Sequence, residues 1–259
     1  VAFSDGKPND IAKKFATSQN IPVDTLIINE HNGKKYLFAQ QDLSKKLPDQ
    51  ITRFANELLV RITVPRPMRW DTTGFRFSRP IRWVVCLKGK AIVPITLLDL
   101  TAGRETYGPR FLGSHGIALH SAAEYEETLA KNAIIADHAK RRKILTKIIS
   151  TLASSKGLIA HDPENELLEE TVFLAEYPQP LLCTFDEEFL SLPPEVIEVV
   201  LRDKQKYFPL ISRTNDKLTN RFLVIANFNT DSQEIARGNE TVVRARLRDE
   251  VFFYEQDSR

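Results

Sequence analysis

Residues 235 to 254 read Ile235-Ala-Arg-Gly-Asn-Glu-Thr-Val-Val-Arg-Ala-Arg-Leu-Arg-Asp-Glu-Val-Phe-Phe-Tyr254. Gly238 and Asn239 predict a turn here, because glycine adopts backbone conformations that other residues avoid. From Glu240 to the last residue there is no glycine or proline, which predicts one uninterrupted helix. We therefore expect a turn followed by a helix that carries arginines and a cluster of aromatic residues.

Size and composition are those of an ordinary globular protein. The chain has 259 residues, of which 42% are hydrophobic and 27% charged. No segment approaches the roughly 20 apolar residues of a membrane-spanning helix, and the start lacks the pattern of a secretory signal. These features predict a cytoplasmic protein without a membrane partner. Because Val1 replaces an initiator Met and the last helix has no cap, we expect a piece of a longer chain.

The first 64 residues predict a small helix, hairpin and helix unit. Residues 8–18 favour a short helix, and residues 25–28 and 36–39 favour two strands around an Asn32-Gly33 turn. Apolar residues recur every three or four positions from 49 to 62, as on one face of a helix. Pro65 and Pro67 predict a stiff linker. We expect a domain boundary at this linker, between residues 1–64 and 65–259.

The larger part predicts an α+β fold, with a mixed or antiparallel sheet and several packed helices. A hairpin is expected from residues 81–87 and 91–98, in which Pro94 points to an edge strand. The expected helices cover residues 121–131, 137–153, 162–175 and 194–202, and the further strands cover 180–185, 207–212 and 222–227. Helices alternate here with strands joined by hairpins, which argues against a doubly wound parallel sheet.

Neither catalytic nor metal-binding residues can be assigned. The sequence contains no glycine-rich phosphate loop, and its histidines lack the spacing of a helical zinc site. His161-Asp162 could belong to a metal phosphohydrolase, but Asp162 before Pro163 is better explained as a helix cap. Ser114-His115 favours a polar loop, and Cys86 and Cys183 favour buried free thiols. No cofactor is therefore expected in this chain.

Two groups of cations are candidate RNA contacts, as the net charge of +2 requires any such contact to be local. The first comprises Lys140, Arg141, Arg142 and Lys143, which we place largely opposite the apolar face of their helix. They could bind RNA phosphates or form a solvated face. The second comprises Arg244, Arg246 and Arg248. Arg246 is expected to point away from the other two, and salt bridges to Glu240, Asp249 or Glu250 are the alternative to RNA.

Aromatic residues leave similar alternatives open. Phe252, Phe253 and Tyr254 could stack on bases, although their helical spacing favours a place in the core. Arg76, Arg79 and Arg82 alternate with aromatic residues, a pattern that fits either a strand pair with cationic edges or an RNA platform.

A series of short motifs, matching in order along the chain, resembles the β subunit of bacterial heterotetrameric glycyl-tRNA synthetase. The motifs are Arg69-Trp70, Phe77-Ser-Arg-Pro80, Glu176-Tyr-Pro178, Phe189-Leu-Ser-Leu-Pro193, Gln205-Lys-Tyr-Phe-Pro209 and Val224-Ile-Ala-Asn227, followed by the final helix. Pro109 and Lys204 depart from the expected pattern, which puts local contacts in doubt. The resemblance implies an interior part of β whose larger portion is similar to the B3/B4-type domain of phenylalanyl-tRNA synthetase.

That resemblance implies a division of labour. The α subunit, separate or fused, would carry the class II aminoacylation core that uses ATP and Mg²⁺, and the β subunit would supply tRNA binding. We therefore expect a non-catalytic module of glycine–tRNA ligase that positions glycine-specific tRNA and docks onto neighbouring domains or the α subunit. The alternatives are a purely architectural scaffold and an editing hydrolase that clears mischarged tRNA.

Overall fold

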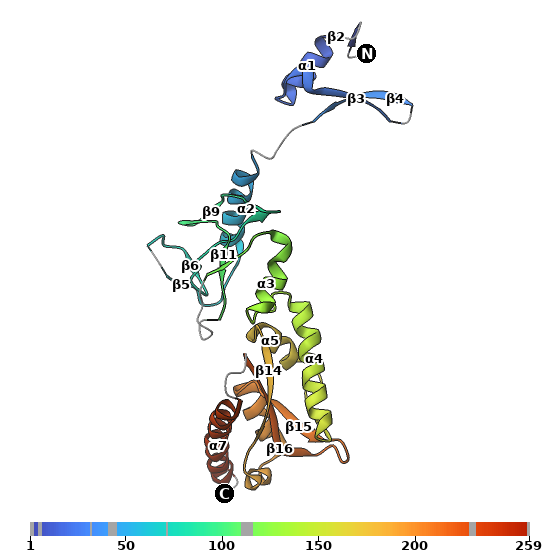
Figure 1. Cartoon of the computed structure of the whole chain (residues 1–259). Coiled ribbons are helices and arrows are strands. Elements are labelled where there is room, and N and C mark those ends of the chain that lie inside the picture. The colour runs from blue at the N-terminus through green and yellow to red at the C-terminus, as the bar shows by residue number, and fades with distance from the viewer. Residues whose placement is uncertain are drawn as a thin grey trace. The chain divides into compact units, whose positions relative to one another are not determined.

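The computed structural model describes residues 3–4, 7–31, 33–40, 46–70, 72–109, 116–227 and 232–257 (Figure 1). The chain divides into two compact units, Val1–Arg104 and Glu105–Arg259. This division differs from the expected one at residue 64, and the contacts of the second long helix explain the difference.

That helix, α2 (Leu47–Arg61), is held to the segment that follows the proline linker. The Asn56 side chain donates to the Thr96 carbonyl at 2.9 Å and accepts from the Leu98 N–H at 3.2 Å. Ile51 packs against a small core formed by Val93, Ile95 and Ala102. Helix α2 therefore belongs with residues 93–102 rather than with residues 1–64 alone.

The first 40 residues form the helix and hairpin that the sequence predicts. Helix α1 (Asp10–Ser18) is capped by Asn9, whose side chain accepts from two backbone N–H groups. Strands β3 (Leu26–His31) and β4 (Lys34–Ala39) pair antiparallel around Gly33, whose φ of 72° favours glycine. The other elements here are the short strands β1 (Phe3–Ser4) and β2 (Lys7–Pro8) and the 3-10 helix η1 (Val23–Thr25).

The rest of the first unit consists of very short strand pairs. They are β5 (Met68–Arg69) with β6 (Arg76–Phe77), β7 (Leu87–Lys88) with β8 (Ala91–Ile92), and β9 (Thr96–Leu97) with β10 (Leu100–Thr101). The hairpin expected over 81–98 extends from its turn to Cys86, whose carbonyl accepts from the Val93 N–H at 2.9 Å, and is wrong beyond that point. Gly103 explains why, since it exchanges backbone hydrogen bonds with Val84 and Cys86 and thereby takes the place of the second arm.

The second unit contains the larger elements. In chain order they are β11 (Glu105–Tyr107), β12 (Gly116–Ala118), η4 (Ala122–Glu124), α3 (Tyr125–Lys131), α4 (His138–Ser155), β13 (Leu158–Ala160), α5 (Glu166–Leu174), β14 (Pro178–Thr184), η5 (Glu187–Ser191), α6 (Pro194–Glu198), η6 (Val199–Lys204), β15 (Phe208–Ser212), β16 (Leu218–Asn227) and α7 (Ser232–Asp257). The predicted helices and strands of this region are present, with shifted ends.

A four-stranded antiparallel sheet, in the order β13-β15-β16-β14, forms the middle layer of this unit. In Figure 1, α4 covers one face of it and α7 the other. Strand β16 alternates accordingly: Leu223 is buried with Leu145 and Ile149 of α4, whereas Phe222 is buried with Leu247 of α7. The fold is α+β with an antiparallel sheet, as the sequence predicts.

Helix α7 begins earlier than expected. It starts at Ser232 and passes through Gly238 and Asn239, so the turn predicted at these residues is wrong. Asn239 is retained in the helix because its amide donates to the Ile235 carbonyl at 2.7 Å, while its oxygen accepts from the Tyr207 hydroxyl. A tertiary contact thus replaces the local turn that Gly-Asn favours.

Two further helices differ from expectation in form. The helix predicted over 194–202 changes after Glu198 into the π-helix η6. Helix α5 begins at Glu166 rather than at Pro163, yet Asp162 still caps it, since its carboxylate accepts from the N–H groups of Leu167 at 3.3 Å and Leu168 at 2.8 Å.

Candidate nucleic-acid interface

Helix α4 carries the first predicted cation cluster and separates its members. Its buried face comprises Leu145, Ile149 and Ala153. Lys140 and Lys143 are exposed, but Arg141 and Arg142 are half-buried, and the Nε atom of each is buried with no hydrogen-bond partner in the described part of the chain. The expectation that these cations lie largely opposite the apolar face therefore fits the two lysines better than the two arginines.

Ion pairs divide the cluster further. Lys140 pairs with Glu126 of α3, and the hydrogen bond that the Lys140 ammonium donates to this carboxylate raises the pKa of Lys140. Arg142 pairs with Glu169 of α5. Among the described residues, Lys143 has no carboxylate partner, and neither does Lys147 one turn further along α4. The exposed lysines of this helix without a carboxylate partner among the described residues are thus Lys143 and Lys147.

A second basic segment, residues 202–206, is neutralised within the protein. Arg202 pairs with Glu166 at 3.2 Å and Lys206 with Glu170 at 2.8 Å, both on α5. Lys204, which departs from the pattern of the family it resembles, pairs with Glu250 of α7 at 2.5 Å. These pairs link the π-helix to its neighbours, which favours a structural role for the segment.

The arginines of α7 divide in the same way. Arg244 makes a bidentate salt bridge with Asp186: its Nε donates to Oδ2 at 2.8 Å and a terminal nitrogen donates to Oδ1 at 3.3 Å. Hydrogen bonds from Arg244 lower the pKa of the Asp186 carboxyl. The predicted salt-bridge partners are therefore wrong, since Glu240 instead accepts from the backbone and hydroxyl of Thr184.

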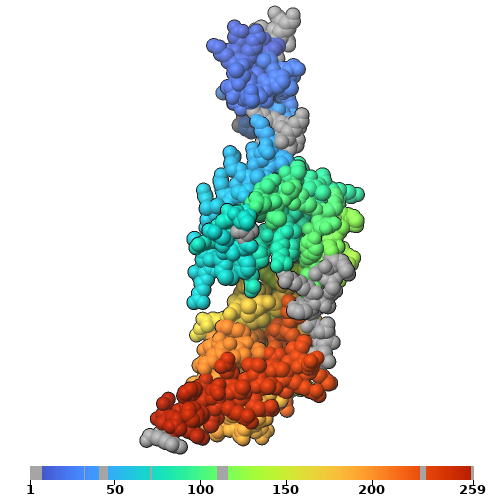
Figure 2. All heavy atoms as spheres, turned by 90° about the vertical axis from the view of Figure 1, so that its left-hand side faces the viewer, coloured from blue at the N-terminus to red at the C-terminus, as the bar shows by residue number. Residues whose placement is uncertain are grey.

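Arg246 and Arg248 are exposed, without an ion-pair partner within the described ranges. As expected, Arg246 lies on a different side of the helix from Arg244 and Arg248, which are four residues apart. Arg237, seven residues before Arg244, lies on the same edge as this pair and is also exposed. Figure 2 shows α7 in dark red on the outside of its unit.

The aromatic residues near the end of α7 do not lie in the core. Phe252 and Phe253 are 58% and 59% exposed, and their rings meet edge to face with centroids 5.6 Å apart. Their predicted place in the core is therefore wrong within this chain. In the first unit, Arg76, Arg79 and Arg82 are exposed, and Phe75 stacks on Phe77 beside a two-residue strand pair.

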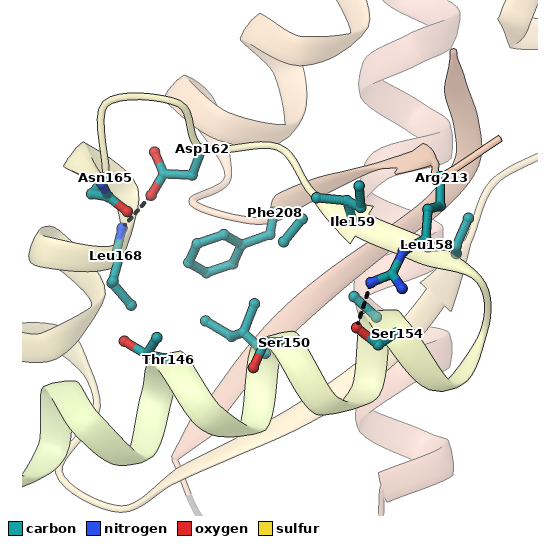
Figure 3. A pocket seen from close by; sticks show the side chains of 13 residues that line it. Thr146, Ser150, Ser154, Leu158, Ile159, Asp162, Asn165, Leu168, Phe208 and Arg213 are labelled. Atoms are coloured by element: carbon teal, nitrogen blue, oxygen red, sulfur yellow. Dashed lines mark hydrogen bonds between the residues drawn. The ribbon is translucent and has the colours of Figure 1, made fainter. Parts of the chain in front are cut away.

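A pocket of about 320 Å³ opens beside α4 (Figure 3). Most of its lining is apolar, from Ile149, Leu158 and Phe208 among others. Asp162 lies at one end in Figure 3, and Arg213 lies at the other, where its guanidinium donates to the Ser154 hydroxyl at 3.0 Å. Sequence reasoning missed this site, because its residues come from α4, β13, β15 and the loops around them.

Within the described ranges there is no group of three or more His, Cys, Asp or Glu side chains that could bind a metal ion. His161 lies 3.7 Å from Glu198, and Asp162 caps α5, which opposes the metal-phosphohydrolase interpretation of this pair. Ser114-His115 lies outside the described residues. No described helix is both long and apolar enough to cross a membrane.

Comparison with known families matches residues 1–259 to the glycyl-tRNA synthetase beta subunit. The chain belongs to this family. It is 39% identical to a glycine–tRNA ligase beta subunit of Moorella thermoacetica over 98% of the chain. The corresponding proteins of Lactobacillus gasseri and Bacillus subtilis are 36% and 34% identical over 98% and 99% of the chain. In each case the chain spans 37% of the relative's length.

Family membership agrees with the motifs quoted above and leaves the RNA-contact residues as predictions. The motif Gln205-Lys-Tyr-Phe-Pro209 has a structural explanation in this member of the family. Lys206 has a φ of 61° where η6 ends, and the Tyr207 N–H bonds the Leu201 carbonyl. The Tyr207 ring stacks on Phe222, and its hydroxyl reaches α7. This motif therefore joins three elements.

Proposed function

We propose that this chain is a non-catalytic module of glycine–tRNA ligase that holds and positions tRNA and docks onto other parts of the enzyme. The ATP- and Mg²⁺-dependent chemistry would belong to the α subunit or to an α-like portion, in the cytoplasm. Support comes from membership of the glycyl-tRNA synthetase beta subunit family and from similarity to glycine–tRNA ligase beta subunits. The chain itself lacks a glycine-rich phosphate loop in its sequence.

The observation that carries the tRNA role is the contrast between Lys140 and the pair Lys143 and Lys147. Lys140 has a carboxylate partner within the protein, whereas Lys143 and Lys147 have none among the described residues. Binding of a cation to an RNA phosphate is favourable because it releases counterions that surround the RNA. An exposed lysine without a carboxylate partner gains more from this contact, because it gives up no ion pair within the protein. Arg246 and Arg248 would add contacts on α7. The small net charge predicts binding that is weak and sensitive to salt.

The test compares two variants of the same helix for binding to a glycine tRNA transcript. Lys143→Gln with Lys147→Gln should weaken binding several-fold and reduce the slope of log affinity against log salt by about 1.5 units. Lys140→Gln, which removes a cation already paired with Glu126, should change both much less. Equal effects of the two variants, or no effect of either at low salt, would remove α4 from the RNA surface.

A docking role has independent support from exposed apolar side chains in the first unit. On α2, Phe54 is 64% exposed and Val60 is 76% exposed, and no residue of this helix is fully buried. Apolar surface of this kind marks protein contacts. A purely architectural scaffold would need only this surface. If the surface docks onto other parts of the enzyme, Phe54→Ser should weaken assembly of the enzyme, as measured by sedimentation. The complexes that still form should bind tRNA with unchanged affinity, as measured by filter binding.

A further inference from the structure

The pocket beside α4 is lined partly by the helix that carries the two lysines without carboxylate partners among the described residues. Positions 143, 147, 150 and 154 follow one another at spacings of four, three and four residues, so they form one ridge along α4. Ser150 and Ser154, at the far end of this ridge, line the pocket. Arg213 also lines it, and its side chain is anchored on Ser154. Arg213 therefore lines the apolar cavity, and Lys143 and Lys147 lie further along the helix ridge that leads to it.

From this arrangement we infer that the pocket receives one unpaired nucleotide base of a bound RNA, while Lys143, Lys147 and Arg213 hold the flanking phosphates. The inference rests on the proposed tRNA role and adds to it the chemical group that is recognised. The volume of about 320 Å³ is at the small end of the roughly 300–1,000 Å³ of ligand pockets, which fits a single flat group.

The polar atoms of the pocket favour a ligand that donates hydrogen bonds. The Thr146 and Ser150 hydroxyls donate to carbonyls of α4 at 3.0 Å each, so their oxygens remain as acceptors. The carboxylate of Asp162 accepts two backbone N–H groups of α5 and has lone pairs left. Figure 3 shows these side chains along the pocket and at its Asp162 end. Exocyclic amines of a base and hydroxyls of a ribose match such acceptors.

The same carboxylate excludes an anion from the interior of the pocket. A phosphate beside Asp162 would meet a like charge, whereas a phosphate on the lysine ridge or at Arg213 would meet opposite charge. An apolar interior with cations at Arg213 and along the adjoining helix ridge is the division that a nucleotide needs, because its base is flat and weakly polar while its phosphate is charged. An apolar protein side chain could fill the interior but would leave the three cations unused.

The test fills the pocket without changing the charge. Ser150→Phe places a ring in the cavity, and Thr151→Phe places the same ring on a neighbouring exposed position of α4 that does not line it. Affinity is measured for a single-stranded RNA of mixed sequence and for the same sequence as a duplex, by fluorescence anisotropy. Circular dichroism checks that each variant folds, and Thr146→Phe serves as a second pocket-filling variant if Ser150→Phe does not.

We expect Ser150→Phe to weaken single-strand binding about tenfold, the order of magnitude for withdrawing one base from its site. Its salt slope should be unchanged, since no cation is lost, and Thr151→Phe should bind like the parent. The variant Lys143→Gln with Lys147→Gln, the lysine variant, should weaken binding to the duplex, whereas neither phenylalanine variant should change it. Titration with AMP and GMP then distinguishes the source: shifted amide signals of Ser150 and Ser154 mean that a free nucleotide suffices, and no shift means that the RNA chain is needed.

The two proposals fail separately in this experiment. If the lysine variant weakens RNA binding while Ser150→Phe and Thr151→Phe bind equally well, the base pocket is wrong and the tRNA role remains. If none of these variants changes affinity for any RNA, the proposed RNA surface of α4 is wrong together with the pocket.

Discussion

The thiol of Cys183 shows how a single side chain reports on the packing around it. Cys183 of strand β14 is fully buried in the core that this strand shares with α7, and this burial raises the pKa of its thiol to about 12. The Glu240 carboxylate adds a smaller effect in the same direction. Because the thiolate is the reactive form of cysteine, both the burial and the raised pKa protect Cys183 from chemical modification.

We predict that Cys183 in the folded protein resists alkylation by iodoacetamide at pH 8. Its thiolate fraction would be about 10⁻⁴, against roughly a tenth for a thiol with the ordinary pKa. Cys86, which is only half-buried, should react first, and both should react in denaturant, as followed by mass spectrometry. The raised folded pKa also means that stability from this group is present below the ordinary value of 9.0 and is lost as the pH rises toward 12.

Single residues also show which parts of the candidate site could be predicted from the sequence. The sequence places Lys140 and Lys143 in one basic run, and nothing local distinguishes them. Their difference comes from Glu126, which lies on another helix and neutralises the first lysine only. The pocket near Ser150 was out of reach for the same reason, because its lining comes from segments brought together by the sheet. Residue types were predictable, whereas tertiary partners were not.

At the scale of elements, helix α4 depends on the cap at its start. The Asp137 carboxylate accepts from the N–H groups of Ala139 at 2.7 Å and Lys140 at 3.3 Å. The Ala139 bond is the largest cause that lowers the pKa of this carboxyl. A lowered folded pKa means that the stabilisation is present above the ordinary value of 3.8 and is lost as the pH falls through the folded value.

We predict that Asp137→Ala lowers the urea midpoint at pH 7 and that this difference from the parent shrinks as the pH falls below 4. Asp137→Asn should keep much of the stability at neutral pH, because asparagine caps helices about as well as aspartate. A difference that stays constant down to pH 2.5 would show that the charged carboxylate is not what stabilises the helix.

Helix α7 gives a sharper test, because sequence and structure disagree over Gly238. This glycine lies inside the helix, and a β-carbon added there would meet nothing within 4 Å. Gly238→Ala should therefore stabilise the protein by about 0.5–1 kcal/mol, since alanine loses less backbone entropy in a helix. The urea midpoint measures this, and a loss of stability would instead favour the turn that Gly238 and Asn239 predict.

Elements with a strong local pattern were predicted well, and those governed by distant partners were not. Helix α4 and strand β15 follow apolar patterns that can be recognised from their own residues alone. The start of α7 and the arms of the expected 81–98 hairpin depend on Tyr207 and Gly103, which come from other parts of the chain. Tertiary contacts override local propensity at such places.

The whole chain has its apolar interior unevenly divided between its two compact units. The second unit has a core on each face of its sheet, one with α4 and one with α7. The first unit has a small cluster of three buried residues, Val93, Ile95 and Ala102, against helix α2, and exposes apolar side chains elsewhere. Burial of apolar surface is the main stabilising contribution to folding, so the two units should differ in intrinsic stability.

We predict that residues 105–259 produced alone fold and unfold in one cooperative transition, while residues 1–104 produced alone bind the dye ANS and lack a sharp transition. The two core layers of the second unit share strand β16, so loss of either layer exposes the other, which makes the transition cooperative. Urea titrations followed by circular dichroism at two wavelengths measure this. Leu223→Ala, which opens a cavity in the α4 layer, should lower the midpoint of residues 105–259 without splitting the transition. Two separate transitions would show that the layers fold independently of each other.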